Sequence, residues 1–259
     1  WGDIHCGTVD RFVGRALWCP GGMLDTLRPK YQFMHDVLDF RSRNHHDFKN
    51  PHKMFQKYVE GKDDVLQELR DVATFLGKTS YRDFCKTVVV DSNHDNALTR
   101  WLREADYKAD PKNALIFLGT QLAYYTAIAL RDRDFHLLEY VMRTQLKLQQ
   151  DVMFLRPDIP FVICSDANGG IECGMHGHLG PDGARGSLRA YARMGRKSNT
   201  GHGHAAGIED GAYRAGITGA LDQEYNTGPS SWSNSHIVTY PNGKRTIITQ
   251  WGDRAKWRA

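Results

Sequence analysis

The chain has 259 residues, of which 41% are hydrophobic and 11% aromatic, enough for a substantial buried core. We therefore expect a globular protein. The formal charge of +4 permits nucleic acid as a partner but excludes an all-basic binding arm.

Cysteine usage and hydropathy bear on the compartment. The five cysteines are widely spaced and form no C-x-x-C pair, and their odd number favours free thiols in a reducing compartment over a disulfide framework. The sequence shows no signal peptide, so we expect a cytoplasmic protein. The longest apolar run, residues 114 to 130, is shorter than the roughly 20 residues that span a bilayer. A buried helix is the better interpretation, and we expect no membrane contact.

The first elements in chain order are a polar turn, a helix and a strand. Asp3 and His5 stand in "WGDIHCG", without an initiator Met and with only two residues before them. We expect a longer chain whose preceding residues supply the strand before this turn. Residues 53 to 77 predict a helix with a break at Gly61 and a cap at Gly77. The β-branched run of residues 87 to 90 then predicts a buried strand that enters the turn "DSNHD".

The remaining elements complete a mixed α/β pattern. Helices are expected at residues 96–104, 112–131, 135–148 and 185–196, and short strands at "DVMFL", "FVICS" and "IECGMHGH". Near the end, "HIVTYPNGKRTIITQ" predicts a hairpin in which Asn242-Gly243 suits a type I′ turn. We interpret residues 1–259 as a single α/β domain in which the helices of residues 50 to 150 form an insertion or cap around the sheet. The part from about 96 to 150 carries no site motif.

Five short turns gather the residue types that bind metals. They are "GDIH" with Asp3 and His5, "HDVLDF" with Asp36 and Asp39, "DSNHD" with Asn93, His94 and Asp95, "GMHGH" with His176, and "GHGH" with His202 and His204. One such turn is an ordinary polar turn more often than a ligand, but five in this order are far more specific.

This set resembles the calcineurin-like metallophosphoesterase superfamily, whose pattern is D-x-H, G-D-x-x-D, G-N-H-[D/E], a later H, and G-H-x-H. The resemblance runs from residue 3 to residue 204. It implies an α/β fold with a β-sandwich flanked by helices, here with a helical insertion. It also implies two divalent metal ions: one held by Asp3, His5 and His204, one held by Asn93, His176 and His202, and both bridged by Asp36.

The chemistry of this ligand set fits such a site. Imidazole nitrogens together with carboxylate and amide oxygens favour Mn, with Fe or Zn as alternatives, over Mg or Ca. A bridging carboxylate holds two ions roughly 3.5 to 4 Å apart, where they share a hydroxide and clamp phosphate oxygens. In the family, the histidine at the position of His94 assists the leaving group, which suits a pKa near neutrality. Asp95 is the candidate to orient it.

The sequence departs from the family pattern at two positions. His35 and Ser92 replace the glycines that usually precede the bridging Asp and the Asn, where a small residue lets the backbone approach the metals. Neither change removes a ligand. His35 is large enough to alter access or to reach substrate.

Several residues have both a substrate-binding and a structural interpretation. His178 can contact substrate or simply make a structural hydrogen bond. His45 and its neighbours can line a cleft or a surface loop. The helix predicted at residues 185–196 has one basic face, which can bind a phosphate backbone or simply face solvent. This face carries Arg185, Arg189, Arg193 and Arg196.

A two-metal phosphodiester hydrolase that uses a metal-bridging hydroxide is the function that the resemblance implies, and DNA is the substrate that we expect. A looser likeness to phage DNA-transfer nucleases and double-strand-break repair nucleases supports DNA. It rests on "DSNHD", the helical insertion and the ending "NGKRTIITQWGDRAKWR". A phage protein of this kind would act in the host cytoplasm, and homo-oligomers through regions outside this sequence are plausible.

Two other functions remain open at this stage. A phosphatase or cyclic phosphodiesterase for small nucleotides would have a narrow site, whereas a nuclease has an open groove. A non-catalytic scaffold for nucleic acid or protein would have no reason to hold two ions.

Overall fold

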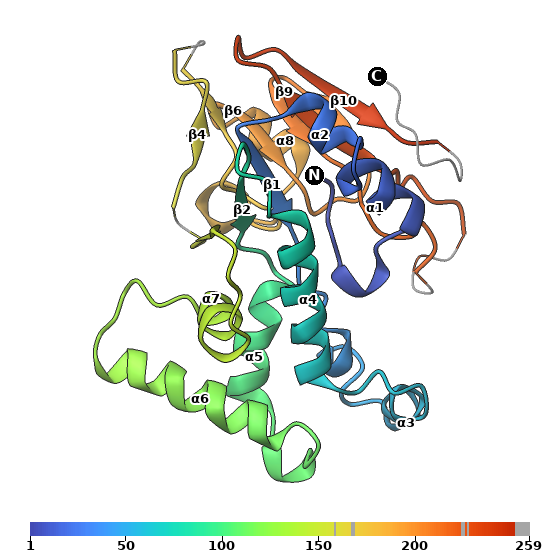
Figure 1. Cartoon of the computed structure of the whole chain (residues 1–259), viewed down its shortest axis with the longest axis vertical. Helices are drawn as coiled ribbons and strands as arrows, with labels where there is room; N and C mark the ends of the chain where they lie inside the picture. Colours follow the sequence, from blue (N-terminus) through green and yellow to red (C-terminus); the bar gives the residue numbers. More distant parts are fainter. Residues whose placement is uncertain (158, 167–168, 224–225, 227, 252–259) are drawn as a thin grey trace. The chain divides into compact units, whose positions relative to one another are not determined.

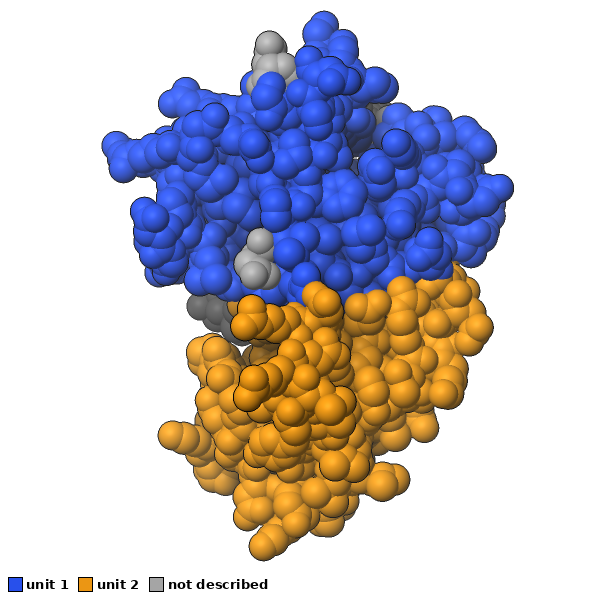
Figure 2. Space-filling model, turned by 90° about the vertical axis from the view of Figure 1, so that its left-hand side faces the viewer, with its two compact units in different colours: residues 1–37, 79–92, 151–259 blue, residues 38–78, 93–150 orange. Residues whose placement is uncertain are grey.

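The chain folds into two compact units. The computed structural model describes residues 1–157, 159–166, 169–223, 226 and 228–251 (Figure 1). Unit 1 comprises residues 1–37, 79–92 and 151–259, and unit 2 comprises residues 38–78 and 93–150 (Figure 2). The end of the stretch "NGKRTIITQWGDRAKWR" lies outside the described residues. That the two units make up one phosphoesterase domain stays a prediction.

All strands of the described residues lie in unit 1. They are β1 (Tyr31–His35), β2 (Lys86–Val90), β3 (Val152–Leu155), β4 (Val162–Ile163), β5 (Ile171–Glu172), β6 (Lys197–Thr200), β7 (Gly207–Glu209), β8 (Ala212–Arg214), β9 (Ser235–Thr239) and β10 (Arg245–Thr249). They form three sheets, so the mixed α/β class is confirmed. The sandwich arrangement stays a prediction.

A parallel sheet in the order β1-β2-β3 carries the buried core of unit 1. Its near-continuous β-branched run, predicted as residues 87 to 90, forms because both faces are covered. Val88 and Val90 on one face are fully buried and pack with Leu155, and Val89 on the other face is 1% exposed. His35 pairs with Val90, so β1 and β2 end together. The polar turns that follow the two strands therefore leave the sheet at the same edge.

The later strands form a five-stranded mixed sheet and a hairpin. The sheet has the order β4-β5-β6-β8-β7, and the turns between its strands carry the three histidines of "GMHGH" and "GHGH" expected as ligands. The predicted strand at "IECGMHGH" is shorter than expected, because only Ile171 and Glu172 pair with β6.

The hairpin of β9 and β10 is confirmed, but its turn differs from the expected type. A type I′ turn needs positive φ at both central residues. Gly243 has φ 78°, whereas Asn242 is not in that region, and the Gly243 amide donates to the Tyr240 carbonyl at 2.9 Å. Pro241 explains the difference, since its ring fixes φ near −65° at the first central position.

Unit 1 also carries three short helices. They are α1 (Arg11–Trp18), α2 (Met23–Leu27) and α8 (Leu188–Ala192). The helix predicted at residues 185–196 is thus only five residues long, and the expected arginine stripe on one helix face is wrong. Arg189 lies within α8, Arg193 caps its end, and Arg185 forms an isolated bridge with Leu179. All three arginines are exposed.

Unit 2 is helical. Its helices are α3 (Pro51–Val59), α4 (Val65–Thr79, whose last residue falls in unit 1), α5 (Asp95–Glu104), α6 (Ala114–Ala129) and α7 (Leu137–Tyr140). The predicted break at Gly61 is confirmed, with φ 67°. Gly77 does not end α4, because it does not adopt the left-handed conformation of a C-terminal cap.

The helix predicted at residues 135–148 is shorter than expected. α7 passes into a π-helical turn at Val141–Gln145. α6 matches the long apolar run in extent, but the expected buried helix is wrong for one of its faces, where Leu115 and Leu122 are 84% and 69% exposed. None of the described helices combines the length and the hydropathy needed to cross a membrane.

Candidate metal centre

The first ligand turn is positioned by the backbone of β1 and by a later segment of unit 1. The amides of Ile4 and His5 donate to the carbonyls of His35 and Asp36 at 2.9 and 2.7 Å, which bonds the turn directly to the end of β1. Asp3 forms a parallel bridge with Ile217 on the opposite side. These bonds hold two motifs together that are more than 30 positions apart in the sequence.

Four of the predicted ligands form one cluster at this edge. Potential ligand atoms of Asp3, His5, Asp36 and His204 all lie within 4.8 Å of one another. The Nε2 atoms of His5 and His204 are 3.1 Å apart, and His204 Nε2 lies 3.3 Å from Asp3 Oδ2. Asp3 and His5 are fully buried. Imidazole nitrogens that converge with carboxylate oxygens in a buried site are the arrangement that a bound cation stabilises.

A second cluster shares a member with the first. Asp36, His176 and His202 also bring their ligand atoms within 4.8 Å of one another, and His176 Nε2 lies 3.1 Å from Asp36 Oδ2. Asp36 thus belongs to both clusters, at the position that the resemblance gives to the bridging ligand. It is 1% exposed.

The backbone is unfavourable at four of these ligand positions. His5, Asp36, His202 and His204 have φ values of 46°, 49°, 69° and 52°. Few non-glycine residues adopt the left-handed region, and each such residue costs of order 1–3 kcal/mol, so strain of this kind is concentrated at functional sites.

Gly201 allows the turns to approach one another. A Cβ atom at this position would collide with Asp3 Oδ1 and would lie 3.1 Å from His35 Cβ. The Gly201 amide donates to the His176 carbonyl at 2.7 Å, and the His202 amide donates to Asp3 Oδ1 at 3.0 Å. The glycine of the G-H-x-H motif therefore lets three ligand turns pack without a side chain between them.

The protonation states suit metal ligation. Burial opposes ionisation of Asp3, but the neighbouring His176 and the hydrogen bond from His204 outweigh it and lower the pKa of Asp3 to about 2. Burial, followed by His176, lowers the pKa of His202 to about 4. An ionised carboxylate and a neutral imidazole are the forms that bind metals. The buried Asp and His clusters can therefore hold a metal ion.

The remaining predicted residues of the centre belong to unit 2. Asn93 and His94 directly precede α5, and Asp95 is its first residue. His94 Nδ1 lies 3.0 Å from the carbonyl oxygen of Asp39 and 3.3 Å from its Oδ1. Asp39 is the second Asp of "HDVLDF", and no sequence pattern indicated that it would be the neighbour of His94.

Asp95 has a structural contact of its own. It is 4% exposed, and its Oδ1 accepts a hydrogen bond from the Leu38 amide at 3.0 Å. Its proposed part in orienting His94 stays a prediction.

The two histidines predicted to bind substrate lie against the metal ligands. His35 is 4% exposed, its ring centroid is 5.6 Å from that of His176, and burial lowers its pKa to about 3. His178 lies 5.5 Å from His176 and 6.1 Å from His202 in the same measure, and burial lowers its pKa. His35 therefore packs inside unit 1, whereas His178 is half-buried beside the second cluster.

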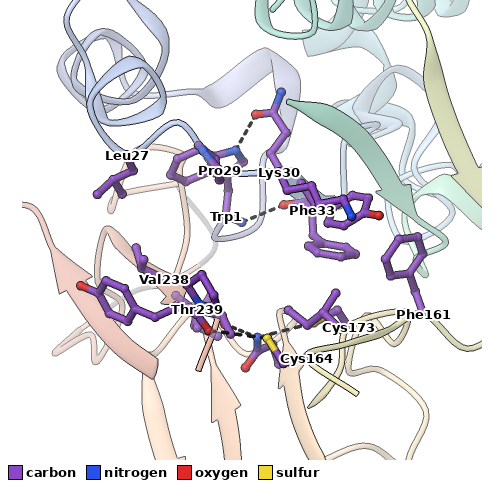
Figure 3. Close-up of a pocket in the computed structure, with 18 of the residues that line it drawn as sticks. Trp1, Leu27, Pro29, Lys30, Phe33, Phe161, Cys164, Cys173, Val238 and Thr239 are labelled. Atoms are coloured by element: carbon purple, nitrogen blue, oxygen red, sulfur yellow. Dashed lines mark hydrogen bonds between the residues drawn. The ribbon is translucent and has the colours of Figure 1, made fainter. Parts of the chain in front are cut away.

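An apolar cavity of about 720 Å³ lies next to His35 in unit 1. Figure 3 shows Phe33 and Phe161 on one side of it and Val238 and Thr239 of β9 on another. The ligand clusters do not line it. No sequence pattern indicated this cavity, because its walls come from strands that are far apart in the chain.

The chain is similar to Protein A1 of Escherichia phage T5, with 45% identity over 253 residues. It is a homologue of a phage protein. The matched region covers 96% of this chain and 44% of the relative, so the chain spans about half the length of the curated protein that it matches. No protein-family model matches the chain, and no solved structure matches it. Membership of the metallophosphoesterase superfamily stays a prediction from the motifs.

Proposed function

We propose that the chain is the catalytic part of a two-metal-dependent phosphodiester hydrolase that cleaves DNA in the host cytoplasm. The observation that carries the proposal is the pair of buried ligand clusters that share Asp36. Two clusters with a common carboxylate provide for two adjacent cations, whereas a single structural metal needs only one set of ligands.

The ligand types support the choice of metal. Asp3, His5, Asp36 and His204 would hold one ion, and His176 and His202 would hold the second together with Asp36. Asn93 is a further ligand of the second ion that only the resemblance implies. Mn is the ion that we propose, with Fe or Zn as alternatives. When bound, such ions polarise the phosphate ester and lower the pKa of a water molecule.

The chain's own residues supply the acid chemistry. Since Nδ1 of His94 lies against Asp39, we assign the proton to Nδ1 and proton exchange with the departing oxygen to Nε2. Asp39 would keep the ring in this orientation and stabilise the imidazolium form. His178 and the exposed Arg185, Arg189 and Arg193 are the proposed contacts with the phosphate backbone.

Similarity to a phage protein is consistent with DNA as the substrate but does not specify it. Protein A1 carries no substrate in its name, and this chain spans less than half of it. We propose DNA and not a small nucleotide because "DSNHD" and the helical insertion resemble those of DNA-transfer and double-strand-break repair nucleases.

The experiment is cleavage of linear duplex DNA with and without Mn²⁺, with Asp36→Asn and His94→Ala as the test variants. Asp36→Asn is expected to abolish cleavage. His94→Ala is expected to reduce it by about 10²- to 10⁴-fold, the usual contribution of a general acid. Asp83→Asn and His52→Ala are matched controls at exposed positions and should cleave like the parent.

A bis-aryl phosphodiester distinguishes the other outcomes. Hydrolysis of this small ester with intact DNA would replace the nuclease with an enzyme for small phosphodiesters. Mn²⁺ binding without hydrolysis of either substrate would contradict the catalytic proposal and leave a binding scaffold.

A further inference from the structure

Unit 2 contains a pocket of about 280 Å³ that no motif predicted. It lies between the segment that carries His45, Phe48 and Lys49 and one side of α5, which contributes Arg100 and Trp101. Its volume is close to the lower end of the roughly 300–1,000 Å³ range of small-molecule sites, so it accommodates one small group.

The pocket carries a net positive charge. Arg43, which also lines it, is neutralised by two 2.6 Å hydrogen bonds to Asp110. Lys49 makes no ion pair with any described residue, and Arg100 contacts His45 Nε2 at 2.9 Å. Glu104 is the opposing charge in the lining. The two unneutralised cations exceed the one anion, which favours an anionic ligand.

One aromatic residue of the pocket lining is held rigidly by its neighbours. Trp101 is 5% exposed, and its indole Nε1 makes no hydrogen bond within the described part of the chain. The ring itself packs against Phe40 and Phe117 at centroid distances of 5.7 and 4.9 Å, so it is fixed in place. Trp101 therefore gives the pocket a wall that does not move when a ligand enters.

The rim adds an aromatic surface beside the cations. Phe48 is 44% exposed and directly precedes Lys49. Proteins that bind single-stranded nucleic acid combine an exposed aromatic ring with a nearby cation. A base stacks on the ring, and the adjacent phosphate binds the positive charge.

We propose that this pocket binds one nucleotide of a single DNA strand, with the base on Phe48 and the phosphate at Lys49 and Arg100. The inference rests on the proposed function, because it assigns part of the DNA contact to the helical unit. It adds a binding site outside the metal centre.

The test measures binding and not cleavage. A fluorescein-labelled single-stranded oligonucleotide is titrated with the protein in EDTA, and fluorescence anisotropy gives Kd at several salt concentrations. The double variant Lys49→Ala/Arg100→Ala should make the slope of log K against log salt shallower by about 1.4, because each phosphate contact on a single strand contributes about 0.7. Phe48→Ala should weaken binding by about 5- to 150-fold, which corresponds to about 1–3 kcal/mol of stacking.

Two further variants separate these effects from misfolding and from general charge. Glu104→Gln should tighten binding because it removes the opposing charge, a gain that a damaged fold does not produce. Arg103→Ala removes an exposed cation that does not line the pocket, and it should leave the salt slope unchanged. An equal loss of slope in Arg103→Ala, or parental affinity in Phe48→Ala and in the double variant, would overturn the inference.

Hydrolysis of the bis-aryl phosphodiester with Mn²⁺ distinguishes this inference from the proposed function. Hydrolysis together with unchanged oligonucleotide binding in the pocket variants would refute the pocket and leave the enzyme. No hydrolysis, together with weaker binding in those variants, would refute the enzyme and leave the pocket.

Discussion

Substitution of Gly201 by alanine tests whether the ligand turns depend on their close packing. The added methyl group would collide with Asp3 Oδ1 and would approach His35 Cβ and Cγ to 3.1 Å. Neither neighbour can move into solvent, since Asp3 is fully buried and His35 is 4% exposed. Gly201 is not among the glycines with positive φ, so the substitution adds a steric conflict without backbone strain.

The expected cost follows from this geometry. Overpacking of a dense interior costs about 1–3 kcal/mol. At about 2–4 °C per kcal/mol for a chain of this size, Tm should fall by about 2–12 °C. Displacement of the Asp3 carboxylate also breaks its hydrogen bond from the His202 amide, so the affinity for Mn²⁺ should fall in calorimetric titration.

A matched substitution makes the prediction sharp. A methyl group added at Gly7 would meet no atom within 4 Å, and Gly7 has no positive φ, so Gly7→Ala should change the free energy of unfolding by less than about 0.5 kcal/mol. Equal Tm values and equal Mn²⁺ affinities for Gly201→Ala and the parent would refute the reasoning that this glycine holds the ligand turns together.

Three other predictions concern stability and reactivity. Arg82 is 7% exposed and donates to a carboxylate and to the Trp18 carbonyl, so Arg82→Ala should lower the free energy of unfolding by at least about 1.5–3 kcal/mol in urea titration; a change under about 0.5 kcal/mol would contradict this. Burial raises the pKa of Glu68 above 4.5, so the folded state binds the extra proton and stability should fall as pH rises from about 4.5 through the folded pKa, a dependence that Glu68→Gln should remove in pH-dependent melts. Burial raises the pKa values of Cys85 and Cys173 to about 12, so a thiol reagent should modify exposed Cys19 in the native protein and these two only after unfolding; rapid native labelling of either would refute their burial.

The ligand clusters were predictable from the sequence because each ligand lies in a short turn with its own signature. "GDIH" and "GHGH" each place two ligands within three residues, and backbone hydrogen bonds at the end of β1 bring the first of these motifs beside Asp36. Parallel strands that end together place such turns at one edge without any further information.

Contacts between residues far apart in the sequence were harder to predict. The contact between His94 and Asp39 joins residues 55 positions apart, and nothing in the spacing of "HDVLDF" and "DSNHD" selects Asp39 over Asp95 as the neighbour of His94. The pocket on α5 depends in the same way on a loop about 50 residues earlier in the chain.

Local patterns also failed where one residue overrode the rest. Pro241 changed the hairpin turn, although Asn242-Gly243 matched the favoured sequence. Spacings of four residues predicted a helix through Arg185, yet Gly186 lies against the Gly177 backbone and the chain there forms a bridge with Leu179 before α8 begins. A local restriction on φ decided the hairpin turn, and a tertiary contact decided the segment around Arg185.

The candidate metal centre contains several features that lower the stability of the fold and that the fold itself does not need. Two carboxylates, Asp3 and Asp36, are buried side by side, and the backbone is in the left-handed region at Asp36 and at three histidines around it. Apolar residues in place of the carboxylates, and glycines at the left-handed positions, would make the fold more stable. The reason is that buried like charges and left-handed non-glycine residues both lower stability. A bound cation would neutralise the two carboxylates and so remove the repulsion between them. The strained backbone directs the imidazoles toward one point, where they would bind the same cation. The same residues that weaken the protein without metal are therefore the ones that would bind metal tightly, which is why stability measured with and without Mn²⁺ is as direct a test of this site as cleavage itself.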